Sequence, residues 1–155
     1  MKLLVVSDSH GDTENLYRAA AATRPDRIIH LGDGWRDAGT LAIRYPSIPL
    51  ERVPGNCDLG AGAPSERLLL LGGKRILICH GHTLHVKSGL LTALYTARER
   101  EADALLFGHT HRPMIDYREG VWLMNPGSIG SSVHPTYGIL TIDGGELRPA
   151  IFELP

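Results

Sequence analysis

No run of apolar residues in this 155-residue chain is longer than four. A membrane-spanning helix needs about 20 mostly apolar residues and a secretory signal needs an apolar stretch of about 7–15, so the sequence predicts neither. Residues 2–6 read as a first strand and not as a removable leader. We therefore expect a cytoplasmic protein that has no membrane partner.

An excess of charge of either sign is also missing, because 16 Lys and Arg residues stand against 17 Asp and Glu residues. General nucleic-acid binders usually carry a basic excess that neutralises phosphates. The balance argues against nucleic acid as a partner. A local basic pocket for a single phosphate is still compatible with it.

Cysteine is scarce: Cys57 and Cys79 are too far apart for a CxxC motif and too few for a disulfide framework, so we expect both to be reduced. Repeats, low-complexity tracts and linker-like stretches are absent as well. With 43% hydrophobic and 21% charged residues the composition is typical of a globular protein, and the length suits one domain over residues 1–155.

The chain does contain a regular alternation of short apolar runs with amphipathic segments, which is typical of an α/β architecture. Two Gly-Gly pairs, at 72–73 and 144–145, each predict a hairpin turn. Early strands separated by helices, followed by hairpins, predict two sheets packed face to face with helices outside. Strands are expected at 3–7, 27–31, 48–53, 67–71, 75–79, 104–107, 114–117, 121–124, 137–142 and 146–153, and helices between Asp12 and Pro25, at 35–45 and at 86–100.

Polar clusters directly follow five of these expected strands. In open α/β sheets, ligands bind outside the carboxyl ends of the strands, where the loops converge. Five clusters in this position predict one common site, whereas core histidines or helix caps would not recur there. The clusters are Asp8-Ser9-His10, Gly32-Asp33, Gly55-Asn56-Cys57-Asp58, His80-Gly81-His82 and Gly108-His109-Thr110-His111.

The residue types in these clusters suit divalent metal ions. Imidazole and carboxylate together favour Mn, Fe, Ni or Zn, whereas an all-oxygen set would favour Mg or Ca. Alternate residues of an extended segment, as in D-x-H and H-x-H, point to the same side. The glycines before Asp33, Asn56 and His109 allow a sharp turn at the strand end.

In chain order the motifs D-x-H, G-D, G-N-x-D, H-G-H and G-H-T-H resemble those of the calcineurin-like metallophosphoesterases. The G-N-C-D variant, the short length and the Asn-Pro-Gly-Ser segment at 125–128 are most similar to the small YfcE-type phosphodiesterases of bacteria and archaea. The resemblance spans nearly the whole chain. It implies the metallophosphoesterase fold, a four-layer α/β sandwich of two mixed sheets with helices outside.

The resemblance also implies a pair of divalent ions, with manganese expected and iron, nickel or zinc as alternatives. Such ions lower the pKa of a bridging water, and the resulting hydroxide attacks the phosphorus of a small phosphate ester. This is the chemistry of a phosphodiesterase; a homo-oligomer is suggested by the resemblance alone. Asp8, His10 and His111 would hold the first ion, Asn56, His80 and His109 the second, and Asp33 would bridge the two.

The chain departs from many larger relatives at Cys57, where they carry a histidine that assists the leaving group. A thiol with an unperturbed pKa of about 8.5 is a poor substitute for imidazolium. Asp58, which orients that histidine in the relatives, loses its partner here. Both residues are candidate catalytic groups, with a packed small residue as the alternative for Cys57.

Two other functions compete with a phosphodiesterase. A non-catalytic scaffold of the same fold can lose metal ligands, but all seven positions are filled here. A nuclease conflicts with the balanced charge. Among the neighbouring residues, His30 is expected to be packed, His82 to support the site or fill a loop, and Arg36 and Arg112 to reach a phosphate or to be solvated.

Overall fold

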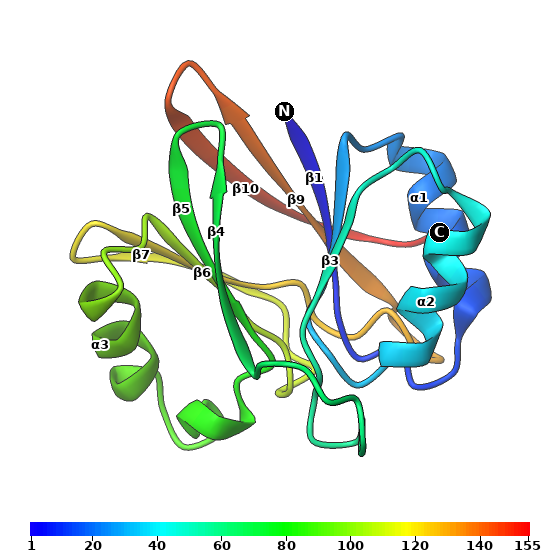
Figure 1. The fold of residues 1–155 in the computed structure, drawn as a ribbon, viewed down its shortest axis with the longest axis horizontal. Helices are drawn as coiled ribbons and strands as arrows, with labels where there is room; N and C mark the ends of the chain where they lie inside the picture. Colours follow the sequence, from blue (N-terminus) through cyan, green and yellow to red (C-terminus); the bar gives the residue numbers. More distant parts are fainter.

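The computed structural model describes residues 1–155, which form two five-stranded sheets and three α-helices. The first sheet has the order β10-β9-β1-β2-β3 and the second the order β4-β5-β6-β8-β7 (Figure 1). The elements are β1 (Lys2–Val6), α1 (Thr13–Thr23), β2 (Arg27–His30), α2 (Trp35–Arg44), β3 (Leu50–Arg52), β4 (Glu66–Leu71), β5 (Lys74–Cys79), a 3-10 turn (His82–Leu84), α3 (Leu91–Glu99), β6 (Ala104–Leu106), β7 (Met114–Arg118), β8 (Val121–Asn125), β9 (Thr136–Asp143) and β10 (Glu146–Glu153).

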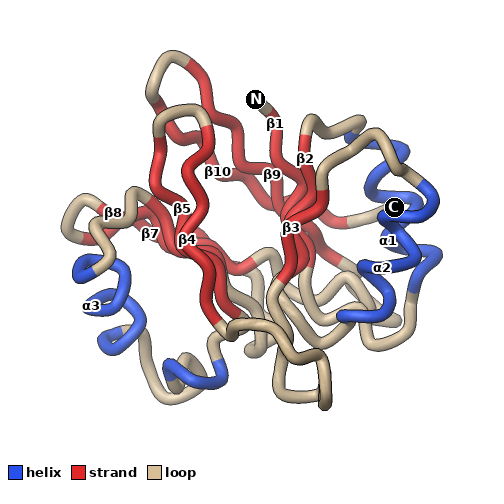
Figure 2. Tube along the Cα trace, viewed as in Figure 1, coloured by secondary structure: helices blue, strands red, loops and turns tan.

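The two sheets pack face to face, α1 and α2 lie on the outside of the first sheet, and α3 lies on the outside of the second (Figures 1 and 2). Strand β1 explains how one segment serves both faces. Leu3 and Val5 point into the core between the sheets, whereas Leu4 and Val6 pack with the helices, because successive side chains of a strand alternate. The predicted four-layer α/β sandwich of two mixed sheets is confirmed.

Local sequence signals set the helix ends. The Asp12 carboxylate accepts a hydrogen bond from Asn15 N–H and caps α1, which stops at Arg24 in the left-handed conformation before Pro25. Strands β4 and β5 pair antiparallel across the predicted Gly72-Gly73 turn. No helix has both the length and the apolar character that crossing a membrane requires.

The expected helix at 86–100 is wrong in its first five residues. Helix α3 begins only at Leu91, and a 3-10 turn and a loop lead to it. Gly89 has φ 145°, which an α-helix does not contain. Val86 is nevertheless buried with Leu94 and Ala97 in one apolar cluster, so the spacing correctly indicated burial but not conformation. The expected strand at 48–53 is shortened to Leu50–Arg52.

The topology brings the carboxyl ends of five parallel strands to one edge. Strands β1, β2 and β3 run parallel to one another, as do β5 and β6. Their following loops gather at the bottom of Figure 2, below both sheets. Backbone bonds join them: Asp8 N–H donates to Gly32 O, and Gly108 N–H donates to His80 O. The predicted meeting of the polar clusters is confirmed.

Candidate metal centre

Strained backbone is concentrated at this edge. Nine residues other than glycine have a positive φ, and five of them are predicted metal ligands: Asp8 (55°), His10 (46°), Asp33 (53°), His109 (68°) and His111 (59°). Such angles are uncommon for residues with a Cβ, and they persist where the surrounding structure enforces them. The strain turns each side chain out of its strand direction and toward the common site.

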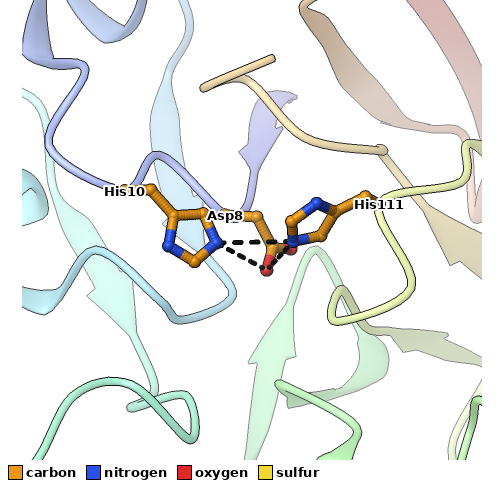
Figure 3. A group of neighbouring side chains, drawn as sticks. All are labelled: Asp8, His10 and His111. Carbon is orange, nitrogen blue, oxygen red and sulfur yellow. Dashed lines mark hydrogen bonds and ion pairs between the residues drawn. The ribbon is translucent and has the colours of Figure 1, made fainter.

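Three side chains from two loops form the first group (Figure 3). His111 Nε2 lies 3.1 Å from Asp8 Oδ1, His10 Nε2 lies 3.7 Å from the same oxygen, and the two imidazole nitrogens are 3.4 Å apart. The Asp8 side chain is fully buried, whereas His10 and His111 are 39% and 50% exposed. A divalent ion held here by two nitrogens and one oxygen would face the solvent.

His80 anchors a second group with both carboxylates. Its Nδ1–H donates to Leu31 O at 2.8 Å, so the lone pair of Nε2 faces inward. This Nε2 lies 3.4 Å from Asp33 Oδ2 and 3.8 Å from Asp8 Oδ1, and it is buried without a hydrogen-bond partner. Buried polar atoms are almost always satisfied. A nitrogen lone pair aimed at two carboxylates needs a cation between them, and the donor set therefore fits a metal ion.

The electrostatics agree with this geometry. Burial disfavours a charged His80, but the Asp33 and Asp8 carboxylates outweigh it and raise the His80 pKa. Desolvation likewise opposes ionisation of Asp33, but the nearby His80 imidazole and the hydrogen bond from Cys57 N–H hold the pKa of Asp33 well below its usual value. The Asp33 carboxylate therefore stays charged and ready to bind a cation.

His10, Asp33 and Cys57 form a third group, so Asp8 and Asp33 each belong to two of the three groups. Asp33 Oδ2 is 3.8 Å from His10 Nε2, while Asp33 Oδ1 accepts Cys57 N–H at 2.8 Å. The His109 ring lies 5.0 Å from the His80 ring, centroid to centroid. Six of the seven predicted ligands thus converge. The seventh, Asn56, is exposed and directs its amide to Cys57 Sγ at 3.5 Å, so its ligand role stays a prediction.

The two candidate catalytic residues have different surroundings. The Cys57 thiol is exposed and lies close to His10 and Asp33. Partial desolvation, followed by the effect of the Asp33 carboxylate, raises its pKa. Asp58 instead accepts backbone N–H bonds from Gly34 at 3.1 Å, Trp35 at 3.0 Å and Gly55 at 2.8 Å. Its carboxylate ties the start of α2 to the turn that carries Asn56 and Cys57.

Sequence reasoning missed the residues that hold Asp8 in place. Ser7 Oγ–H and His109 N–H both donate to Asp8 Oδ2, at 2.6 and 3.1 Å, which leaves Oδ1 for the cluster. Ser128 Oγ–H donates to Asp8 O, and Asn125 Nδ2–H donates to Gly108 O, both at 2.8 Å. The 125–128 segment therefore fastens two ligand loops.

A chain of hydrogen bonds, buried at His30 and Ser9, supports the Asp8–His10 loop. Gly32 N–H donates to His30 Nδ1 at 3.2 Å, so Nε2 carries the proton and donates to Ser9 Oγ at 3.0 Å. Ser9 then donates to Asp37 Oδ2 at 2.6 Å, which also accepts Gly11 N–H. His30 is packed and not a ligand, as the sequence indicated. Ser9, Asp37 and His30 are too far apart in sequence for a motif to reveal the chain.

This chain predicts a pH dependence of stability. Burial lowers the pKa of His30 from 6.5 to about 4, although nearby carboxylates raise it somewhat. The unfolded state therefore binds a proton more readily than the folded state, and stability is lost as pH falls from about 6.5 to 4. The expected loss is about 3 kcal/mol. Urea unfolding at several pH values tests this. His30→Gln should be less stable than the wild type at pH 7, but it should lack the part of the fall in stability at acid pH that comes from protonation of His30. Parallel pH profiles of the two proteins would contradict the assignment.

Two cavities open beside the centre. One of about 530 Å³ is lined by Trp35, Arg36, Cys57 and Leu59 next to His10 and Asp33. The other, of about 390 Å³, is lined mainly by hydroxyl groups and His134, next to His10 and His111. Both give a bound molecule access to the metal-binding groups.

Known proteins that are similar to this chain are phosphoesterases by name. YsnB of Bacillus subtilis strain 168, named a probable metallophosphoesterase, is 38% identical over 149 residues that cover 92% of this chain and 85% of that protein. The phosphodiesterase YfcE of Escherichia coli K12 is 31% identical, with 92% and 89% coverage. A crystal structure of a predicted phosphoesterase from Streptococcus pneumoniae TIGR4 is similar at a TM-score of 0.83 and 28% identity, with 98% and 88% coverage. Residues 1–145 match the calcineurin-like phosphoesterase superfamily domain, and the chain belongs to that superfamily.

Proposed function

We propose that this protein is a metal-dependent phosphodiesterase that hydrolyses small phosphate esters with two divalent ions. The observation that carries the proposal is His80 Nε2, a buried lone pair without a partner that faces the Asp8 and Asp33 carboxylates. The relatives named as metallophosphoesterase and phosphodiesterase support the reaction class. The mixed nitrogen and oxygen donors favour manganese, with iron, nickel or zinc as alternatives.

The chain's own residues position the reaction. Two divalent ions, when bound, supply an activated water and charge neutralisation for the phosphoryl oxygens. Asp8, His10 and His111 would hold one ion; His80, His109 and Asn56 would hold the other; Asp33 would bridge them. No side chain has to act as nucleophile: Ser9 is fully buried and donates to Asp37, and the Cys57 thiol has a raised pKa.

The test is hydrolysis of bis-p-nitrophenyl phosphate by the purified protein, before and after metal removal. We expect turnover that is strongest with Mn²⁺, disappears with a chelator and returns when Mn²⁺ is added. Undiminished turnover in protein shown by elemental analysis to be metal-free would rule out the mechanism. Tight metal binding without hydrolysis of any phosphate mono- or diester would favour the non-catalytic scaffold.

We further propose that Cys57 lies on the leaving-group side. An alkoxide departs badly unless it is protonated, whereas nitrophenolate departs readily, and a well-placed general acid contributes about 10²–10⁴-fold. Cys57→His should therefore raise the ratio of alkyl-ester to nitrophenyl-ester turnover, by at least about tenfold. The exposed position at the rim of the 530 Å³ cavity leaves room for the larger ring.

The ratio is measured at saturating metal, with both proteins shown to be folded. A packing role for Cys57 predicts instead that stability and both activities fall together. An unchanged or lower ratio would remove Cys57 from the catalytic residues.

A further inference from the structure

Most basic side chains of this protein are already engaged. Of the 16 Lys and Arg residues, twelve make an ion pair, a side-chain hydrogen bond or a contact with an aromatic ring. The other four make none of these: Arg24, Arg36, Lys87 and Arg112. Arg24 lies beyond the end of α1, and Arg36 lines the cavity beside Cys57.

Lys87 and Arg112 share a separate cavity of about 550 Å³. Its lining is otherwise apolar apart from Thr110, with Val86, Leu90, Phe107 and Met114, and it contains no carboxylate. The two cations come from loops far apart in the sequence and have no protein counter-ion. Two uncompensated positive charges over an apolar lining are complementary to an anion attached to a carbon skeleton.

The same loops that carry the predicted ligands carry these cations. Arg112 directly follows His111, and Arg112 N–H donates to Thr110 Oγ1 at 3.2 Å. Asn125 Nδ2–H donates to the same hydroxyl at 3.0 Å, so this loop is fastened to the end of β8. Because the loop is fixed, the backbone position of Arg112 relative to the metal centre is fixed as well.

Lys87 is held through its neighbour. Val86 is buried, and its methyl groups occupy the space where Gly81, next to His80, has no side chain. Phe107 and Thr110, which lie on either side of Gly108-His109 in the chain, both line this cavity. The cavity with its two cations therefore adjoins the metal centre on the side of His109.

We propose that Lys87 and Arg112 form a second anion site, which selects phosphodiesters whose alcohol component carries a further phosphate. The inference rests on the proposed function and names the substrate class of the same centre. A phosphate dianion matches two cations in charge, and the guanidinium fork suits its oxygens. The apolar lining accommodates the carbon skeleton that joins the two phosphates.

Binding is measured on the Mn²⁺-loaded protein by calorimetry with two probes, thymidine 5′-phosphate and thymidine 3′,5′-bisphosphate. We expect the bisphosphate to bind about tenfold tighter, since each partly exposed charge contact changes affinity about two- to fivefold. The double variant Lys87→Gln, Arg112→Gln should reduce the preference to about one. Arg24→Gln is the matched control, because it removes an equally unpartnered cation remote from the cavity, and it should keep the preference.

Equal affinity of the wild-type protein for both probes would overturn the second anion site, as would a preference that survives in the double variant. A parallel assay uses the 5′-p-nitrophenyl esters of the same two nucleotides, where the 3′-phosphate should lower KM by a similar factor. Failure of metal-loaded protein to cleave either ester, or bis-p-nitrophenyl phosphate, counts against the proposed function. Cleavage of both esters with equal KM counts against the anion site alone.

Discussion

Replacing Asp33 by alanine should lower turnover of an activated diester at least ~100-fold, because the carboxylate that we propose to bridge two ions is lost. Asp33 connects three parts of the centre. Its Oδ2 faces both His80 and His10, while its Oδ1 accepts a hydrogen bond from Cys57 N–H. The variant loses a metal-binding charge and frees the Cys57 turn. The apolar cores do not include Asp33, so the protein should remain folded.

Asp33→Asn separates these two effects. The amide oxygen can still accept Cys57 N–H, whereas the negative charge facing His80 is gone. We therefore expect Asp33→Asn to lose activity and metal content nearly as severely as Asp33→Ala, but to keep more of the wild-type stability. Turnover, elemental analysis and thermal unfolding of the three proteins measure the contrast. Near-wild-type turnover and metal content in Asp33→Ala would refute the bridging assignment.

The convergence of the site was predictable because its signals are local. An apolar run followed directly by a polar cluster marks the carboxyl end of a buried strand, and parallel neighbours then bring such ends together. Asp8, Asp33 and His80 come from three different strand ends, and both carboxylates lie within 3.8 Å of His80 Nε2. Asp8 and Asp33 flank one shared nitrogen, and this could not be read from spacing alone.

Features that depend on the three-dimensional structure could not be predicted from the sequence, for physical reasons. Val86 and Leu90 have helical spacing, and both pack in the apolar cluster that contains Leu94 and Ala97 of α3. Gly89 between them nevertheless has a backbone conformation that is found in loops and not in helices. Apolar spacing reports burial, and a buried loop can satisfy it as well as a helix. Likewise Ser9 and Asp37 become partners only after β2 and α2 have placed them side by side, and no periodic pattern records such a pair.

Gly55→Ala should disable the centre although it replaces none of the proposed ligand residues. The sequence suggested that this glycine permits a turn, but the structure gives a sharper reason. A Cβ on Gly55 would lie 2.1 Å from Asp33 Oδ1 and 2.5 Å from Asp33 N. Backbone cannot retreat as a flexible side chain can, so the carboxylate and the turn must separate. The Gly55 N–H bond to Asp58 ties the same turn in place and limits the relaxation.

The expected result is a loss of turnover comparable with that of Asp33→Ala, about 100-fold, together with a lower metal content. Stability should fall by about 1–3 kcal/mol, the usual cost of overfilling a packed site. Gly39→Ala supplies the matched control. It adds the same methyl group within α2, where the nearest contact is the flexible Arg52 side chain at 3.3 Å, and alanine favours a helix by up to about 1 kcal/mol over glycine.

Turnover, metal content by elemental analysis and urea unfolding distinguish the two glycines. Gly39→Ala should keep wild-type activity and equal or exceed wild-type stability. If Gly55→Ala does the same, Asp33 can move away from its observed position without consequence. The close packing of Gly55 against Asp33 would then have no part in holding the proposed metal-binding carboxylate. Asp33 would have to be flexible, and its observed position would not be required for activity.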